Sequence, residues 1–389
     1  MTAAVLPFRT RVALRAHAVR AAARRTPGPR AVRVLSKVLE QVGWFEARLG
    51  PALPKRVAGR WILRPMIPAW PSPAYDVWLN GLLQELDPVG TTPPALAAVL
   101  FAVTRRCPLA CAHCSAHDEL GSKEHLSREQ LLAIVDSLQA HGVAQLHLTG
   151  GEPMARFADV LAVVAHASPR SEVWINTAGV GLTVPRAKAL AAAGLRGLHL
   201  SLDDPSPARH DAFRGLPGTF SWVERAAAAA VEAGLVLTVS VCPTRELMDA
   251  GGLEQIRDLA AQWGAHFIRV VEPHAVGKWS GSDVKLGTDH GEAVDAFIAD
   301  LNASDDGPNG FGDAWLGRKV GCLAGGWRVA YVDSDGDVRG CPFATRKAGS
   351  VLDGELSAAL TQLRAGGCAR FGVPKVPGLA TGVSTVAGD

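Results

Sequence analysis

Short apolar runs alternate with longer amphipathic stretches through the middle of the chain, a pattern typical of strands and helices that follow one another. After the first run, Ser127 and Gln130 predict a helix that begins with a capping box, and Gly142 predicts its end. Strands joined through helices form a parallel sheet with right-handed crossovers. Six runs have strand length, at residues 98–104, 145–149, 172–176, 198–202, 235–241 and 266–271.

Six strand-helix units indicate an α/β fold that contains an incomplete barrel. They are too few for a closed eight-stranded barrel, and they are more repetitive than most open doubly wound sheets. We therefore expect an incomplete (β/α)6 TIM-like barrel over residues 95–275. Enzymes with parallel barrels place their chemistry at the carboxyl ends of the strands, so candidate site residues are expected there.

The segments on either side of the barrel have different patterns. Residues 9–33 and 34–49 show helical spacing of apolar positions, and Pro88, Pro93 and Pro94 mark a linker. These features predict a basic helical N-terminal extension with a proline-rich linker over residues 1–94. A helix around residues 292–301 and a hairpin at 328–339, turning at Asp335-Gly336, predict a smaller unit over residues 276–389.

Charge is distributed unevenly along the 389 residues, although the formal net charge is only +3. The first 64 residues hold fourteen lysines and arginines against Glu40 and Glu46. Together with Trp61, Trp70 and Trp78, this extension could contact an anionic membrane surface, cap the barrel or form a dimer arm. Its aromatic positions match no nucleic-acid module, so no nucleic-acid partner is expected.

The seven cysteines indicate metal binding or chemistry rather than disulfides. Their number is odd, and the N-terminus shows no apolar stretch of signal-peptide length. No apolar run of about eighteen residues exists that could span a membrane. We expect a reducing, cytoplasmic location, with peripheral contact of residues 1–64 at the inner membrane surface as an open alternative.

Three cysteines follow the first predicted strand in a short loop, as Cys107, Cys111 and Cys114. Three thiolates on one loop can hold a [4Fe–4S] cluster and leave its fourth iron without a protein ligand, so that this iron can bind substrate. Zinc is the main alternative, with His113 or His117 as a fourth ligand. A reactive redox pair or buried structural thiols are further alternatives.

The order of motifs resembles the radical S-adenosylmethionine (SAM) superfamily. Cys-x3-Cys-x2-Cys after the first strand is similar to that family's cluster loop, in which the residue before the last cysteine, here His113, is usually aromatic. After the second strand, Gly150, Gly151, Glu152 and Pro153 are similar to its Gly-Gly-Glu-Pro motif. The resemblance implies that the backbone and carboxylate of this motif receive the SAM amino group. Physically, glycines permit close approach and Glu152 offers an anion to an ammonium.

Further polar residues at strand ends extend the resemblance to about residues 98–273. Ser201 and Asp203 resemble a Ser-Leu-Asp segment near the SAM ribose or carboxylate, although Asp203 and Asp204 could instead form an Asx turn. Arg214 resembles a family residue that could meet the SAM carboxylate, or it is a solvated surface arginine. Asn176 is a similar strand-end residue, and Val271 with Val270 would pack on adenine or simply belong to the core.

The spacing Cys322-x13-Gly336-x4-Cys341 resembles the beginning of the auxiliary-cluster domains called SPASM and twitch, and Cys368 is the further cysteine that follows it. The resemblance implies a second [4Fe–4S] cluster, with an open iron or a fourth ligand such as Asp, His or Cys242. The sequence lacks the further close cysteine pair of full SPASM domains, so structural thiols are the alternative. Cys242, at the end of the fifth predicted strand, is a candidate catalytic thiol that could return a hydrogen atom, or a buried cysteine.

The resemblance implies reductive cleavage of SAM to methionine and a 5′-deoxyadenosyl radical, with an electron donor such as flavodoxin or ferredoxin. We expect hydrogen abstraction from a small molecule or natural-product precursor, leading to dehydrogenation, carbon–carbon bond formation or rearrangement. The alternatives are modification of a ribosomally made peptide, modification of a membrane lipid or isoprenoid, and a non-catalytic iron–sulfur scaffold. The N-terminal extension does not resemble a leader-binding domain, which favours the small molecule.

Overall fold

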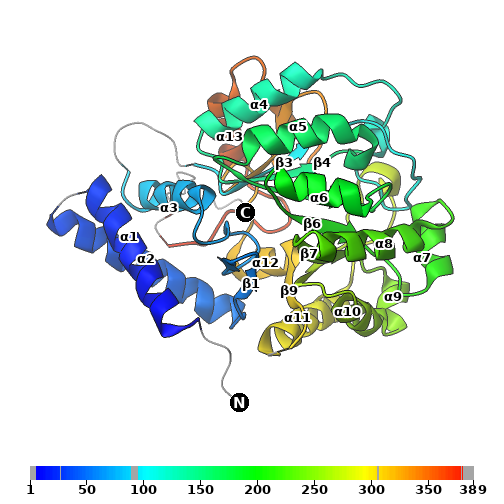
Figure 1. The fold of residues 1–389 in the computed structure, drawn as a ribbon, viewed down its shortest axis with the longest axis horizontal. Coiled ribbons are helices and arrows are strands. Elements are labelled where there is room, and N and C mark those ends of the chain that lie inside the picture. Colours follow the sequence, from blue (N-terminus) through cyan, green and yellow to red (C-terminus); the bar gives the residue numbers. More distant parts are fainter. Residues whose placement is uncertain (1–5, 27, 89–94, 305, 378, 380–389) are drawn as a thin grey trace, which may run out of the picture.

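A mixed β-sheet, with parallel and antiparallel strand pairs, forms the centre of the protein. The computed structural model describes residues 6–26, 28–88, 95–304, 306–377 and 379. The strand order is β12-β11-β10-β3-β4-β5-β6-β7-β8-β9, and every pair from β10 and β3 through to β9 is parallel (Figure 1). The six predicted strands correspond to β3 (Ala98–Ala102), β4 (Gln145–Thr149), β5 (Glu172–Thr177), β6 (Leu195–Ser201), β7 (Val236–Val241) and β8 (Phe267–Val270). The predicted α/β fold class is confirmed.

Helices cover the outer face of this sheet. They are α4 (Arg128–Ala140), α5 (Phe157–Ala167), α6 (Val184–Ala192), α7 (Pro207–Arg214), α8 (Thr219–Glu232), α9 (Arg245–Asp249), α10 (Gly252–Gln262) and α11 (Thr288–Ala303). The core lies between these helices and one set of alternating strand residues, among them Phe101, Leu148, Ile175, Leu200 and Val239. The predicted capping box of α4 is confirmed: the Ser127 hydroxyl accepts from the Gln130 N–H, and the Gln130 side chain accepts from the Ser127 N–H.

The C-terminal part adds strands to both ends of the sheet. β9 (Asn309–Gly312) pairs with β8 and was not among the predicted strands. The predicted hairpin forms β10 (Val329–Val332) and β11 (Asp337–Arg339), and β10 lies parallel to β3. β12 (Lys347–Ser350) is the edge strand, and α12 (Asp313–Val320) and α13 (Leu356–Gly366) complete this part. Strands from both sides of residue 275 thus belong to one sheet. The division into domains at this residue stays a prediction.

The N-terminal extension consists of α1 (Phe8–Arg25), α2 (Pro29–Leu49), the hairpin β1 (Lys55–Val57) and β2 (Arg60–Ile62), and α3 (Pro73–Leu86). The two predicted helices are present, but the break between them lies near Gly28, not at residue 33. Gly28 has φ 74°, and Pro29 begins the next helix, so these two residues end the first helix early. The predicted linker residues Pro93 and Pro94 lie outside the described residues.

Residues 53–69 close the amino-terminal end of the barrel. Ile62 and Ala69 pack with Trp174, Val236 and Phe267, which point inward from the strands. The strand ends bind this segment: Asn309 Nδ2 donates to the Leu53 carbonyl at 2.6 Å, and Glu172 accepts from the Ala69 N–H at 2.8 Å. The extension was expected to contact a membrane, to cap the barrel or to form a dimer arm. The contacts of residues 53–69 are those of a cap on the barrel.

The aromatic residues of the extension pack within the protein. Trp70 and Trp78 lie against the cluster of Ala22, Val34 and Leu83, which joins α1, α2 and α3. Among the described residues, no helix combines the length and apolar character needed to cross a bilayer.

Candidate functional site

The three cysteines after β3 surround a small apolar cluster at the carboxyl end of the sheet. Cys111 is buried, and Cys107 and Cys114 are half-buried and pack against it with Leu109 and Ala178. All three are free thiols, and burial raises the pKa of Cys107 to about 12. Such thiols lose their protons only to a cation that binds sulfur strongly, which iron does.

The spacing of these sulfurs favours a cluster over a single zinc ion. Zinc holds its sulfur ligands at about 2.3 Å, which keeps them within about 4 Å of each other in a tetrahedron. Among the described residues, the group of three possible ligand atoms that lie within 4.8 Å of one another comes from Asp333, Asp335 and Asp337, and no cysteine belongs to it. The three sulfurs thus do not all lie as close together as the ligands of one zinc ion.

The glycine pair after β4 lies directly against the cysteine loop. A side chain on Gly150 would place its Cβ 2.4 Å from the Thr104 carbonyl oxygen, and one on Gly151 would come within 2.3 Å of the Arg106 oxygen. The Gly151 N–H donates to the Thr104 carbonyl at 2.9 Å, and the Glu152 N–H donates to that of Arg106 at 2.8 Å. Glycine is thus required at both positions for the two loops to approach.

Glu152 links the ends of β4 and β5. Its buried carboxylate accepts from the Thr177 hydroxyl at 2.6 Å and from the N–H groups of Met154 and Ala178 at 2.9 and 2.8 Å. Pro153 begins the short helix η2 (Pro153–Arg156) behind it. A carboxylate offers about four acceptor positions, so one remains for a ligand ammonium. The part of Glu152 in SAM binding stays a prediction.

Arg214 and Asp203 form a buried ion pair beneath the cysteine loop. Arg214 Nη2 lies 2.5 Å from the Asp203 carboxylate, and Nη1 lies 3.7 Å from Cys111 Sγ. Burial alone would raise the pKa of Asp203, but the Arg214 charge holds it below its usual value. The alternative of a solvated surface arginine is wrong, because Arg214 is 7% exposed. The Asx turn is made by Asp204, which accepts from the Ser206 N–H at 2.7 Å.

Two segments hold the outer side of the cysteine loop. At the end of α7, the Phe213 carbonyl accepts a hydrogen bond from the Ala112 N–H of the loop at 2.8 Å. Lys278, in the short helix η3 (Gly277–Trp279), donates its N–H to the Cys114 carbonyl at 3.0 Å and its ammonium to the Ala110 carbonyl at 2.9 Å. His113 stacks on Phe213 with ring centroids 4.9 Å apart.

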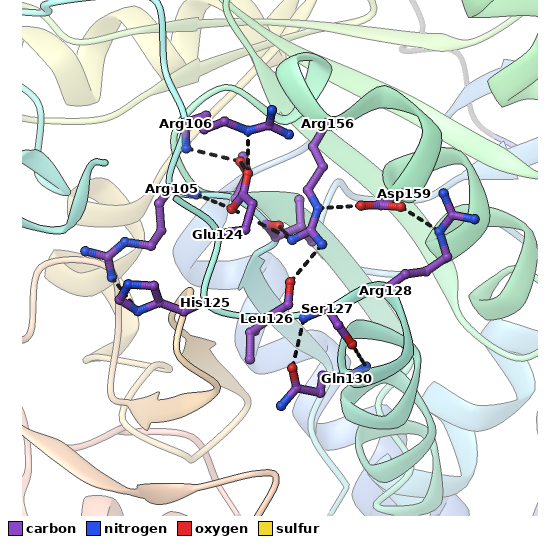
Figure 2. Close-up of polar contacts among 12 residues, drawn as sticks. Arg105, Arg106, Glu124, His125, Leu126, Ser127, Arg128, Gln130, Arg156 and Asp159 are labelled. Carbon is purple, nitrogen blue, oxygen red and sulfur yellow. Dashed lines mark hydrogen bonds and ion pairs between the residues drawn. The ribbon is translucent and has the colours of Figure 1, made fainter. Parts of the chain in front are cut away.

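Glu124 joins the two ends of the segment that contains the cysteines (Figure 2). Its carboxylate accepts from the Thr104 hydroxyl at 2.6 Å, the Arg105 N–H at 3.0 Å and Arg106 Nε at 2.7 Å. Arg156, just after the glycine motif, donates to the carbonyls of Val103 and Leu126 at 3.0 and 2.8 Å. Sequence reasoning missed both residues, since a charged residue in a loop gives no sign of its distant partners.

We expect Glu124→Ala to loosen the cysteine loop. Three donors lose one shared acceptor, so the free energy of unfolding should fall by about 1–3 kcal/mol, and reconstituted protein should release iron to a chelator faster. Chemical denaturation and the rate of iron release measure these effects. Glu224→Ala removes an exposed carboxylate on α8 and should change neither; equal effects of the two substitutions would contradict the role of Glu124.

A half-exposed ring of inward-facing residues lies inside the barrel near the carboxyl ends of the strands. Asn176 and Ser201 were predicted from their strand ends, and the half-exposed Val271 follows β8, where its N–H donates to the Val241 carbonyl. Thr149, Ser240 and Arg269 were missed. Alternation along each strand could have found them, because side chains two residues apart in a strand point to the same face. Ser240 pairs with Ser201 and with Arg269, and Thr149 pairs with Ala102. The ring consists of Thr149, Asn176, Ser201, Ser240 and Arg269.

A stack of buried aromatic rings closes the barrel below this ring. His147, Trp174 and His199 stack on one another with centroids 5.1 to 6.1 Å apart. Burial lowers the pKa of His147 to about 3 and that of His199 well below its usual value, and the Arg269 charge acts in the same direction. Both imidazoles are therefore neutral at pH 7.

These two histidines should make the apo protein sensitive to acid. Their pKa is lower in the folded state than the ordinary value of 6.5, so the unfolded chain binds protons first. The free energy of unfolding should fall as pH drops from about 6.5 to about 4, by up to about 1.4 kcal/mol per pH unit for each histidine. Denaturation across this range should show a shallower fall for His147→Gln/His199→Gln than for wild type. An unchanged slope would contradict this, and His166→Gln, at the exposed end of α5, is the control.

The C-terminal cysteines come together from three segments. Cys322 follows α12, Cys341 follows β11 and Cys368 follows α13. Burial, then the neighbouring Cys368, raises the pKa of Cys322 to about 12. Burial also raises the pKa of Cys341, and Cys368 acts in the same direction. Next to them, Arg370 pairs with the buried Glu272 at 2.7 Å, which fastens this part to the end of β8.

Cys242 lies at the end of β7, as predicted, but its thiol is buried. The residue is 5% exposed, and its N–H donates to Asp203 at 3.0 Å. Burial, then the nearby Asp203 charge, raises the pKa of its thiol well above the usual value. The accessible thiol that the strand end favoured is thus absent from this structure, and a hydrogen-donor role for Cys242 stays a prediction.

Comparison with known proteins places this arrangement in a family. The model of the radical SAM superfamily matches residues 101–246. The PqqA peptide cyclase of Methylocella silvestris is 34% identical over 227 residues, which are 58% of each chain. That of Ruegeria pomeroyi is 32% identical over 264 residues, 65% of this chain and 69% of the relative. The AdoMet-dependent heme synthase of Oleidesulfovibrio alaskensis is 29% identical, covering 67% and 73%.

Solved structures share the fold at low sequence identity. Streptococcus suis SuiB bound to its precursor peptide SuiA superposes with a TM-score of 0.57 at 14% identity, over 79% of this chain and 74% of that chain. The chain spans about half to seven tenths of the length of the curated relatives it matches. The similarity in fold agrees with the predicted incomplete barrel. On its sequence relatives and its motifs, the chain belongs to the radical SAM superfamily, whose cofactors are SAM and a [4Fe–4S] cluster.

Proposed function

We propose that this chain abstracts hydrogen from a residue of a ribosomally made peptide, using a [4Fe–4S] cluster held by Cys107, Cys111 and Cys114. The observation that carries this proposal is the contact of the cysteine loop with Gly150 and Gly151, beside a half-exposed polar interior. The expectation of a small-molecule substrate gives way to the peptide, because relatives of 32–34% identity are named as peptide cyclases. A small-molecule substrate is the second candidate, because another relative is named as a heme synthase.

The residues around the loop would bind and orient SAM. The free acceptor position of Glu152 would take its ammonium, and the backbone of Gly150 and Gly151 permits close approach. Asn176, Ser201 and Val271 line the interior above the histidines and would contact the nucleoside. Asp203 and Arg214 act on the loop from beneath, because they are already paired with each other. When bound, the reduced cluster would supply the electron that cleaves SAM into methionine and a hydrogen-abstracting 5′-deoxyadenosyl radical.

Cys322, Cys341 and Cys368 would hold a second [4Fe–4S] cluster. Their thiols are free and adjoin one another, which supports a shared metal group. Such a group would accept the electron left on the peptide after hydrogen abstraction. A flavodoxin or ferredoxin would serve as electron donor to the first cluster.

The remaining alternatives have less support. Membrane contact and a lipid substrate depended on Trp61, Trp70 and Trp78 at an interface, yet Trp70 and Trp78 pack against the helices of the extension. The scaffold alternative requires a damaged SAM site, whereas the cysteine loop and Glu152 are intact.

Transfer of deuterium tests the proposal. Peptides encoded by short reading frames next to the gene would be synthesised with deuterated residues and mixed with anaerobically reconstituted protein, SAM and dithionite. We expect deuterium in 5′-deoxyadenosine and loss of hydrogen from one peptide. Peptides that neither change in mass nor donate deuterium, while a tetrapyrrole or another small molecule does, would overturn the peptide substrate.

A further inference from the structure

The N-terminal extension contains a basic groove between α1 and α3. These helices lie beside the sheet and its covering helices (Figure 1). We propose that this groove binds an acidic segment of the peptide substrate, outside the residues that are modified. The proposal rests on the peptide function above and adds a second site to it. The groove has a volume of about 470 Å³ and is lined by His17, Arg20, Ala21, Arg24 and Arg25 of α1 and by Asp76, Leu79 and Asn80 of α3.

Two arginines of the groove, Arg20 and Arg24, have no ion pair with any of the described residues. No acidic residue occurs in α1, whose arginines at positions 20, 24 and 25 recur at the spacing of one helical turn. The Nε and Nη2 atoms of Arg25 are buried, and neither has a hydrogen-bond partner among the described residues. The groove's carboxylate, Asp76, already pairs with His17 at 2.6 Å. A bound anion would therefore pair with Arg20 and Arg24, which the described residues leave without an acidic partner.

Burial also makes the charge of Arg25 costly without a ligand. Desolvation lowers the pKa of Arg25. The negative charge of Asp87 raises this pKa in part, and the positive charge of Arg30 lowers it further. Asp87 is already engaged by Arg30, at 2.7 and 2.9 Å. A carboxylate in the groove would thus stabilise a half-buried cation that is only partly compensated.

The other lining residues favour a peptide over a phosphate polymer. Ala21 and Leu79 give the groove apolar contact surface, which suits side-chain methylenes. Asp76 and Asn80 place oxygen acceptors opposite the arginines, where backbone N–H groups of a peptide could donate. The Asp76 carboxylate would repel a continuous run of phosphates. An acidic peptide matches both sides of the groove.

Binding of a model acidic peptide to the full chain tests the groove. A fluorescein-labelled peptide of alternating Glu and Ala is titrated with reconstituted protein, and fluorescence anisotropy gives the dissociation constant. Arg24→Gln/Arg25→Gln should weaken binding about tenfold. Arg11→Gln/Arg15→Gln removes the same charge from exposed positions of the same helix outside the groove, and it should weaken binding less than about threefold. Equal weakening by both variants would overturn the proposal.

A variant with reversed charge distinguishes loss of the binding site from loss of folding, because it should gain a new preference rather than only lose affinity. Arg20 and Arg24 are exposed, so Arg20→Glu/Arg24→Glu should fold and should shift preference from the Glu-Ala peptide to a Lys-Ala peptide. An RNA oligonucleotide that binds more tightly than the Glu-Ala peptide, and loses affinity in the groove variant, would overturn the assignment to a peptide. Uncoupled formation of 5′-deoxyadenosine should be the same in all variants. Its absence from wild type would contradict the proposed function and leave the binding result to decide on the groove.

Discussion

Replacing Cys107, Cys111 and Cys114 together by alanine is expected to abolish SAM cleavage and to reduce the iron content of the reconstituted protein from about eight atoms to about four. The reason is that these three thiols pack against one another beside the Gly150-Gly151 backbone, where the SAM-binding cluster would be held. Iron and sulfide analysis and chromatography of 5′-deoxyadenosine after addition of dithionite measure both effects.

The matched control removes the other three cysteines. Cys322→Ala/Cys341→Ala/Cys368→Ala should also lose about four irons, yet it should still form 5′-deoxyadenosine without peptide, because the first cysteine loop is unchanged. Zinc in place of iron, or continued SAM cleavage by the Cys107→Ala/Cys111→Ala/Cys114→Ala variant, would contradict the assignment of the first cluster.

The elements that carry the cysteine loop could be predicted because their signals are local. β4 begins and ends where its predicted run does, and the capping box at Ser127 needs only two residues that are three positions apart. The cysteines and the Gly-Gly-Glu-Pro motif follow strand ends, and parallel strands bring their carboxyl ends to one edge. Local pattern therefore predicted both the fold class and the place of the candidate site.

Long-range pairings could not be predicted in this way. Nothing near Val329–Val332 indicates that it pairs with β3, more than two hundred residues earlier in the chain. Arg214 gave the same local signal for a surface position as for its buried pairing with Asp203. Arg269 was taken only as part of a strand, since the direction of a side chain depends on the register with neighbouring strands.

Arg214→Ala is expected to lower the free energy of unfolding of the apo protein by about 3–5 kcal/mol, because it leaves the Asp203 charge buried without its partner. Arg214 is 7% exposed and Asp203 is 5% exposed. Water therefore cannot take the place of the arginine beside the Asp203 carboxylate. Chemical denaturation at pH 7 measures this loss. Arg214→Met/Asp203→Leu, which removes both charges and keeps apolar volume, should recover much of it.

The dependence of this loss on pH separates charge from lost packing. Arg214 holds the pKa of Asp203 below its usual value of 3.8, so the pair contributes stability above about pH 4, and this contribution is lost as pH falls through the lower pKa of the folded state. In Arg214→Ala, burial without the arginine raises the pKa of Asp203, and the carboxyl takes up a proton at higher pH. The difference in unfolding free energy between wild type and Arg214→Ala should therefore shrink as pH is lowered from 7 toward 4. A difference that stays constant over this range would mean that the cavity left by the side chain, rather than the unpaired charge, causes the loss.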